Sequence, residues 1–226
     1  MNYRIFPISD HALTVEFGSE ISVALNNSVL NLADFLDRNS FPGLIEIVPA
    51  YASLSFFYDV RIVRRNFPAF PTAFEAVKNF TENALKNLND CVAVESRSVK
   101  IPVSFDKESA LDLEYVAQTN NLSPEKVIQL FLARTYRVYM LGFLPGFSYM
   151  GEVDGQIATP RKDSPRLRVS KGSVGIAGKQ TGIYSLESPG GWQIIGSTNV
   201  ELFTPNEEKL TFLQAGDSVK FYRTSF

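Results

Sequence analysis

Apolar residues in the first part of the chain recur with the period of a strand and then with that of a helix. Leu13, Val15 and Phe17 alternate with polar residues, which predicts a half-buried strand. Thr72 is a suitable N-cap for a later helix. In chain order we expect a strand at 13–17, a helix at 25–36, strands at 44–48 and 54–58, a helix at 72–88 and a strand at 99–105.

This order of elements, βαββαβ, is that of a ferredoxin-like α/β sandwich, with the strand at 99–105 closing the unit. The glycine distribution indicates a second architecture further along. Of the 14 glycines, only Gly18 and Gly43 precede Gly142. We therefore expect an α+β protein with an N-terminal α/β domain at 1–92 and a turn-rich β domain at 93–226.

The second part begins with helical patterns and continues as short apolar runs between Gly and Pro turns. Ser123 and Pro124 are suited to the N-cap and first position of a helix that continues to about Ala133, and a shorter helix precedes it at 111–118. Many short strands with such turns are typical of a β-barrel or sandwich. We expect these strands at 136–143, 174–177, 183–186, 193–196, 200–203 and 218–222.

Composition narrows the function classes. The chain has 226 residues, 45% hydrophobic, with a formal net charge of −2, so it is expected to be globular. It has one Cys and one His, which argues against disulfide scaffolds and His-rich metal sites, and we expect no metal bound by this chain. It lacks a long apolar run and a signal pattern, so the expected location is the cytoplasm.

The first part offers little catalytic chemistry. His11 is either a general base or a turn histidine, and the second is favoured because no partner for catalysis is visible. Cys91 is interpreted as a buried, inert thiol rather than a nucleophile. Arg61, Arg64 and Arg65 are interpreted as a solvated face rather than a nucleic-acid site, since the net charge is negative.

Three segments of the second part could bind a ligand. The first is a tight turn at 142–147 with Phe143, Pro145, Gly146 and Phe147. The second, at 159–171, is basic and suited to a phosphate or carboxylate, although a solvated loop is an equal alternative. The third, at 172–181, is Gly-rich, either for close ligand approach or for barrel turns. It is not a P-loop, because Ser173 and Gln180 break that pattern.

Longer motifs resemble a known family. The matching motifs are YRVYMLGFLPGF at 136–147, ATPR at 158–161, GSVGIA at 172–177, QTGIY at 180–184 and SPGGWQIIG at 188–196. The terminal Gly216–Phe221 run and Ile47-Val-Pro49 also fit. The resemblance is to the B-type subunit of 5-oxoprolinase, also called allophanate hydrolase subunit 1 or the KipI type, which contains carboxyltransferase subdomains C and D. It covers essentially the whole chain.

The resemblance implies a cyclophilin-like β-barrel after the α/β domain. It also implies two partners, a related barrel protein (the C-type subunit) and a LamB/YcsF-type protein (the A-type subunit), that together with it open 5-oxoproline to glutamate with ATP. Because a lactam carbonyl is a poor electrophile, phosphorylation by ATP would make its oxygen a leaving group. The chain alone is expected to have little turnover. The alternative is a non-enzymatic KipI-type inhibitor of a sensor histidine kinase.

Candidate residues follow from this chemistry. Glu187 is a possible base or an ion-pair partner of the basic segment, and Trp192 either plugs the barrel or stacks on a ligand. The cations expected to stabilise transferring charge are Arg161, Arg166, Arg168 and Lys171. The residues expected to contact substrate or nucleotide are Gln180, Thr181 and Tyr184, with Gly178 and the aromatic turn.

One position departs from the family pattern. The pattern has a histidine where this chain has Phe131, and Phe-Pro-Tyr where it has Phe147-Ser148-Tyr149. If that histidine is catalytic, its loss favours a binding role or a site completed by a partner. If it only lines a pocket, Phe131 is a tolerable exchange.

Overall fold

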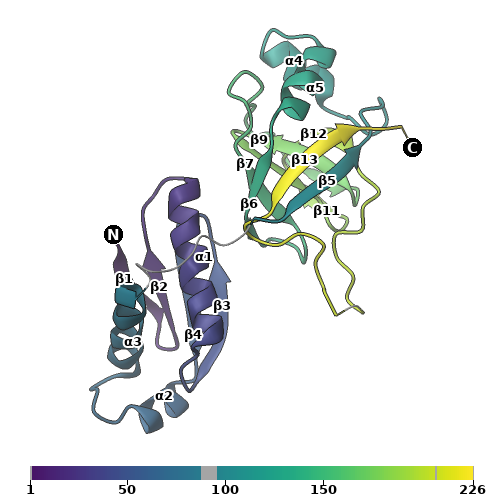
Figure 1. Cartoon of the computed structure of the whole chain (residues 1–226). Helices are drawn as coiled ribbons and strands as arrows, with labels where there is room; N and C mark the ends of the chain where they lie inside the picture. Colours follow the sequence, from purple (N-terminus) through teal and green to yellow (C-terminus); the bar gives the residue numbers. More distant parts are fainter. Residues whose placement is uncertain (1, 88–95, 207, 226) are drawn as a thin grey trace. The chain divides into compact units, whose positions relative to one another are not determined.

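The computed structural model of the chain describes residues 2–87, 96–206 and 208–225. The chain divides into two compact units, Met1–Glu95 and Ser96–Phe226, and each has its own hydrophobic core. Helices and mainly antiparallel sheets make it an α+β protein (Figure 1). Within the described ranges, no helix is both long and apolar enough to cross a membrane.

The first unit is a four-stranded sheet in the order β1-β2-β4-β3 with helices packed on one face (Figure 1). Neighbouring strands are antiparallel. The Thr72 hydroxyl accepts a hydrogen bond from the Glu75 N–H at 3.1 Å, which confirms the predicted cap of the last helix. The elements are β1 Arg4–Ser9, β2 Ala12–Glu16, α1 Val23–Arg38, β3 Leu44–Pro49, β4 Ser53–Tyr58, α2 Val60–Asn66 and α3 Ala73–Asn87.

The prediction that the strand at 99–105 closes this first unit is wrong. That strand, β5 (Ser98–Val103), pairs in parallel with β13 (Ser218–Arg223) along its whole length. The edge beside β2 is occupied instead by β1. The sequence offers little sign of β1, because most of its residues are exposed and its apolar positions do not alternate cleanly.

The second unit is a nearly closed, barrel-like sheet of seven strands in the order β12-β9-β10-β7-β6-β13-β5. Beyond β5, Ser104 and Ser197 exchange backbone hydrogen bonds of 2.8 and 2.9 Å across the remaining gap. Strands β8 and β11 form a separate pair. The remaining elements are α4 Leu113–Thr119, α5 Pro124–Ala133, β6 Tyr136–Leu141, β7 Ser148–Gly151, β8 Arg166–Val169, β9 Ser173–Ala177, β10 Gln180–Ile183, β11 Ser188–Gly190 and β12 Gln193–Ser197.

Most short elements of the second unit were predictable, with a few displacements. Helix α5 is confirmed, since the Ser123 hydroxyl accepts from the Lys126 N–H at 3.2 Å. The strand expected at 183–186 lies three residues earlier, as β10. The strand expected at 200–203 is absent; these residues contribute only a bridge between Phe203 and Thr211. Strands β7, β8 and β11 were not predicted, because each has only three or four residues, too few for a clear periodicity.

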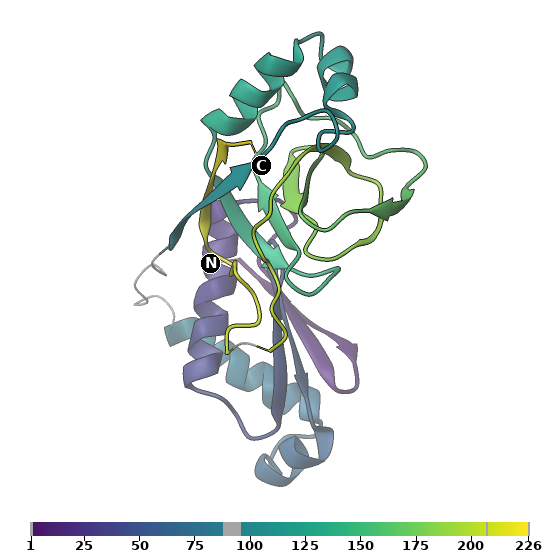
Figure 2. The same ribbon diagram turned by 90° about the vertical axis from the view of Figure 1, so that its right-hand side faces the viewer.

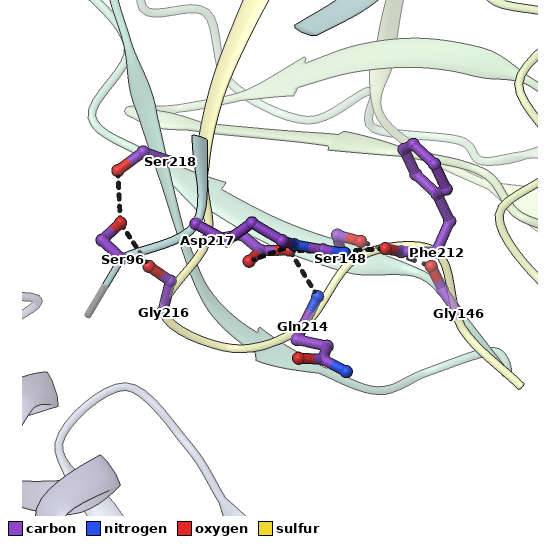
Figure 3. Close-up of polar contacts among 9 residues, drawn as sticks. Ser96, Gly146, Ser148, Phe212, Gln214, Gly216, Asp217 and Ser218 are labelled. Carbon is purple, nitrogen blue, oxygen red and sulfur yellow. Dashed lines mark hydrogen bonds and ion pairs between the residues drawn. The ribbon is translucent and has the colours of Figure 1, made fainter. Parts of the chain in front are cut away.

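Helices α4 and α5 lie together at one end of the barrel-like sheet, and the long loop between β12 and β13 extends from the other (Figures 1 and 2). Polar contacts fasten the end of this loop to the start of β5 (Figure 3). The Arg97 guanidinium donates to both Asp217 carboxylate oxygens at 3.0 and 2.5 Å, and to the Phe212 carbonyl at 2.6 Å. The Ser96 hydroxyl donates to the Gly216 carbonyl at 2.9 Å.

Candidate functional site

The site is a pocket of about 260 Å³ whose walls are mainly aromatic rings and Pro-Gly backbone. It lies where the turn after β6 meets the basic segment before β8 and the region between β10 and β12. Pockets of this kind, with apolar walls and few polar groups, are the usual form of a small-molecule site. Its lining residues are Phe143, Phe147, Tyr149, Arg161, Pro165, Tyr184, Pro189, Gly190, Gly191 and Trp192.

The turn at 142–147 holds an aromatic side chain in a strained position. Phe143 has a φ of 68°, an uncommon value for a residue with a Cβ, and its side chain is 63% exposed. Such outliers persist where the surroundings enforce them, often at ligand sites. The same turn also packs closely at Gly146, where an added Cβ would lie 2.7 Å from the Leu202 carbonyl oxygen.

Phe147 is the centre of the aromatic wall. Its ring makes edge-to-face contacts with Tyr149, Tyr184 and Trp192 at centroid distances of 4.8, 5.3 and 5.5 Å. Phe143 packs edge-on against the same ring at 5.6 Å, from the pocket mouth. Because four rings share one neighbour, the wall is fixed by packing before any ligand arrives.

Arg161 is the cation of the pocket. Its guanidinium carbon lies 5.7 Å above the Trp192 ring. The other cations of the basic segment have acidic partners, whereas Arg161 has none among the described residues. A cation that faces a pocket without a carboxylate nearby is suited to receive an anionic ligand.

Asp112, at the start of α4, binds two cations of the basic segment and holds it in place. Its side chain is 5% exposed and accepts from Arg166 at 2.8 and 2.6 Å, from Lys162 at 3.1 Å and from the Ile194 N–H at 2.7 Å. Burial alone would raise the pKa of Asp112, but the hydrogen bonds from Arg166, Ile194 and Lys162 outweigh it and hold the pKa below its usual value.

The backbone around Arg161 is fixed as well. The Gln193 side-chain amide donates to the Pro160 carbonyl at 2.9 Å, and the Lys162 N–H donates to the Gly191 carbonyl at 2.8 Å. These bonds flank Arg161 on both sides in the sequence. Together with Asp112, they hold the arginine over Trp192 rather than leaving it on a free loop.

Tyr184 supplies a polar group to the wall. Burial raises the pKa of its hydroxyl, while a hydrogen bond from the Trp192 backbone and the charge of Arg161 oppose the rise. The net pKa lies above the ordinary value, so the hydroxyl keeps its proton at neutral pH. Tyr184 can therefore act as a hydrogen-bond donor to a ligand oxygen.

Five residues proposed from the sequence come together in this pocket, namely Phe143, Phe147, Arg161, Tyr184 and Trp192. Trp192 is 4% exposed, packs in a small core cluster and also lines the pocket, and stacking of a ligand on its ring stays a prediction. Sequence reasoning missed Tyr149, Pro165, Pro189, Gly190 and Gly191. The SPGGW motif was the available signal for Pro189, Gly190 and Gly191, but none of these three has a polar side chain that would mark it as pocket wall.

The other proposed residues lie outside the pocket lining. Arg168 pairs with Glu187 at 2.7 Å, Lys171 pairs with Glu201, and Arg166 binds Asp112. The Thr181 hydroxyl is buried and donates to the Gly175 carbonyl at 2.9 Å. Gly178 is at the turn of the β9–β10 hairpin, Gln180 begins β10, and Pro145 and Gly146 shape the aromatic turn from behind.

The candidates of the first unit do not form a site. His11 is exposed, and its Nδ1 lies 3.3 Å from the Ser9 hydroxyl. Arg61, Arg64 and Arg65 lie on α2, where Arg64 donates to the Phe70 carbonyl. Cys91 is outside the described residues.

Phe131, where the resemblance led to the expectation of a histidine, is a core residue. It is fully buried, stacks on Phe221 at a centroid distance of 5.0 Å and packs at a tilt against Tyr136 at 5.1 Å. It belongs to the main core cluster, whereas the pocket aromatics form another. A histidine at this position in this fold would pack in the core, so the exchange removes no group from the pocket.

The lining residues of the pocket are suited to bind and orient a ligand. Among its lining residues there is no carboxylate, thiol, imidazole or serine hydroxyl. In the described ranges, no three His, Cys, Asp or Glu side chains gather as metal ligands. One cation, two phenolic hydroxyls and aromatic faces remain as the means of recognition.

Gly190 sets the shape of this pocket, and its replacement by Ala is expected to disturb it. The added methyl would lie 2.3 Å from the Tyr184 hydroxyl oxygen and 2.7 Å from the ring carbon that bears it, so this buried ring would have to shift. Overpacking of this kind lowers the free energy of unfolding by about 1–3 kcal/mol. Gly155→Ala is the control, since its methyl would meet no atom within 4 Å. Denaturant unfolding of both variants measures the difference; equal stabilities would contradict this packing.

Comparison with known proteins places these residues in context. Residues 3–213 match the carboxyltransferase domain, subdomain C and D. A relative from Bacillus subtilis (strain 168), named as the B-type subunit of 5-oxoprolinase, is 45% identical over 226 residues, covering 100% of this chain and 94% of the relative. One of the same name from Escherichia coli O157:H7 is 35% identical over 219 residues, covering 96% and 94%.

A solved structure is also similar. The crystal structure of TTHA0988 is 37% identical and has a TM-score of 0.79, with 95% of this chain covered. This chain spans only 40% of the TTHA0988 chain. The same sequence unit therefore occurs both as a chain of this length and as part of a longer one.

Proposed function

Because the chain belongs to the family of carboxyltransferase domains, subdomain C and D, and within it to the B-type subunits of 5-oxoprolinase, we propose that it serves as that subunit in an ATP-dependent 5-oxoprolinase. This complex would open 5-oxo-L-proline with water to L-glutamate while ATP is hydrolysed. The observation that carries the proposal is the 45% identity over all 226 residues to a relative of that name.

The proposal includes the partners that the resemblance implies. The chain would act in the cytoplasm in a hetero-oligomer with a related barrel protein, the C-type subunit, and a LamB/YcsF-type protein, the A-type subunit. Its own contribution would be the aromatic pocket, which lacks a nucleophile or general base among its lining residues. This composition supports a subunit that is inactive alone and completes its chemistry in the complex.

ATP would supply the phosphoryl group that turns the lactam oxygen into a leaving group. A triphosphate site commonly uses a glycine-rich turn before a helix, or several converging cations. The Gly-rich segment of this chain forms the β9–β10 hairpin, and the pocket has a single cation. The aromatic pocket and the Gly-rich hairpin therefore do not fit a triphosphate.

The proposal is tested by assembling the complex and measuring ATP-dependent release of glutamate from 5-oxoproline. Arg161→Ala is expected to lower kcat/KM by about 10- to 100-fold, because a charge-assisted hydrogen bond contributes about 1.5–3 kcal/mol. Arg223→Ala is the matched control, since that arginine is exposed and pairs with Glu125. A well-folded, complete assembly without glutamate release would overturn the proposed function.

The finer fold assignments are proposals of the same kind. We infer a cyclophilin-like barrel for the second unit, and for the first a ferredoxin-like sandwich in which β1 occupies the outer position beside β2. The kinase-inhibitor alternative stays a prediction.

A further inference from the structure

We propose that the aromatic pocket is the binding site for the lactam itself, a small planar ring with one carboxylate, and that it does not hold the nucleotide. The inference rests on the proposed function and goes beyond it, because it assigns one of the two substrates to this chain. It follows from the size of the pocket, its charge, its hydrogen-bond donor and its rigidity.

Size favours the lactam. The pocket measures about 260 Å³, below the roughly 300–1,000 Å³ that is usual for drug-sized ligands. 5-Oxoproline is a single five-membered ring, whereas ATP has roughly three times as many non-hydrogen atoms. The whole lactam fits such a volume, while a nucleotide would leave most of its atoms outside.

The charge of the pocket lining also favours the lactam over a nucleotide. The lining has one cation, Arg161, and no carboxylate, so it balances one negative charge. The neighbouring cations already have acidic partners, since Lys162 and Arg166 share Asp112 and Arg168 pairs with Glu187. A triphosphate, with several negative charges, would need those cations to leave their partners, at an energetic cost that a monocarboxylate avoids.

The pocket walls match two further features of a lactam, its planar amide and its ring carbonyl. The planar amide can lie against the faces of Trp192 and Tyr149, which flank Phe147. The Tyr184 hydroxyl, protonated at neutral pH, can donate to the ring carbonyl. This hydrogen bond would fix the orientation of the ring carbonyl in the pocket.

The pocket is held ready for such a ligand. Asp112 and Gln193 fix the segment that carries Arg161, and the turn with Phe143 rests on the loop fastened by Asp217. Rigid placement reduces the entropy lost on binding, which matters most for a ligand with few contacts.

The single tryptophan of the chain makes this testable. Since Trp192 is the sole tryptophan and lines the pocket, its fluorescence reports on the site alone. The full-length chain is titrated with 5-oxo-L-proline, with 2-pyrrolidinone, which lacks the carboxylate, and with ATP and adenosine. We expect a saturable change with 5-oxo-L-proline and at least tenfold weaker binding of 2-pyrrolidinone.

Two variants define the contact. Arg161→Ala is expected to weaken 5-oxo-L-proline binding at least tenfold and to leave 2-pyrrolidinone binding nearly unchanged, whereas Arg223→Ala should bind both like the wild type. Saturable binding of ATP or adenosine that 5-oxo-L-proline displaces would overturn the inference, as would the absence of any lactam response. If the complex is active but this chain does not bind the lactam, the proposed function stands and the lactam site is overturned. If this chain binds the lactam but the complete complex shows no turnover, the lactam site stands and the proposed function is overturned.

Discussion

Replacing Asp112 by Ala is expected to lower the free energy of unfolding by about 3 kcal/mol and to displace Arg161 from the pocket. Breaking a buried ion pair by removing one partner costs about 3–5 kcal/mol, and the lower value applies because Lys162 and Arg166 are about a quarter exposed. The Ile194 N–H would also lose its side-chain acceptor. Glu125→Ala, which breaks the exposed pair with Arg223, is the control and should change stability much less.

A second variant separates positioning from stability. Asp112→Asn keeps the shape of the side chain and an oxygen that can accept from the Ile194 N–H, but loses the charge that holds Lys162 and Arg166. We expect the folded Asn variant to bind 5-oxo-L-proline more weakly, seen in Trp192 fluorescence. Unchanged lactam affinity in a folded Asn variant would show that Asp112 does not position Arg161.

The same carboxylate predicts a pH dependence. Because the pKa of Asp112 is lowered in the folded state, its contribution to stability is present above the ordinary Asp value of about 4 and is lost as the pH falls through the lower, folded pKa. The stability difference between wild type and Asp112→Asn should therefore narrow below about pH 4. Unfolding by denaturant at several pH values measures it.

Replacing Phe131 by Ala is expected to lower the free energy of unfolding by about 3–5 kcal/mol, the usual range for a buried Phe. The ring is fully buried between Phe221, Tyr136 and Phe105, so its removal leaves a cavity that these rings cannot fill. Phe131→Leu, which retains most of the apolar volume, should lose much less.

A second measurement tests whether position 131 takes part in the chemistry. If Phe131 serves packing alone, Phe131→Leu in the assembled complex should keep most of its turnover per folded molecule. A stable Phe131→Leu variant with abolished turnover would instead assign this position a direct part in the chemistry.

Local patterns predicted the elements whose signals are local. The cap by Ser123 and the apolar stripe of α5 are contained in one stretch, and the helix forms where expected. The assignment of β5 failed because its partner β13 is about 120 residues away. No periodicity in a strand states which sheet it will join.

The residues of the site were likewise predictable only where their signals are local. Phe143 and Phe147 were found because Gly and Pro mark their turn, and Arg161 because it lies in a dense basic segment. Asp112 was missed because its contacts with Lys162 and Arg166 span 50 and 54 residues. Which of several cations is paired and which faces a ligand depends on such distant partners, so the sequence could not separate Arg161 from Arg168.

The parallel pairing of β5 with β13 determines when the second unit can fold during synthesis. All six residues of β13 pair with β5, and β13 also pairs with β6, so the sheet lacks an inner strand until residues 218–223 have left the ribosome. The described elements of the first unit all precede residue 88 and can pack while translation continues. The nascent second unit would meanwhile expose the edges of β5 and β6, which makes it the part of the chain most in need of chaperone protection.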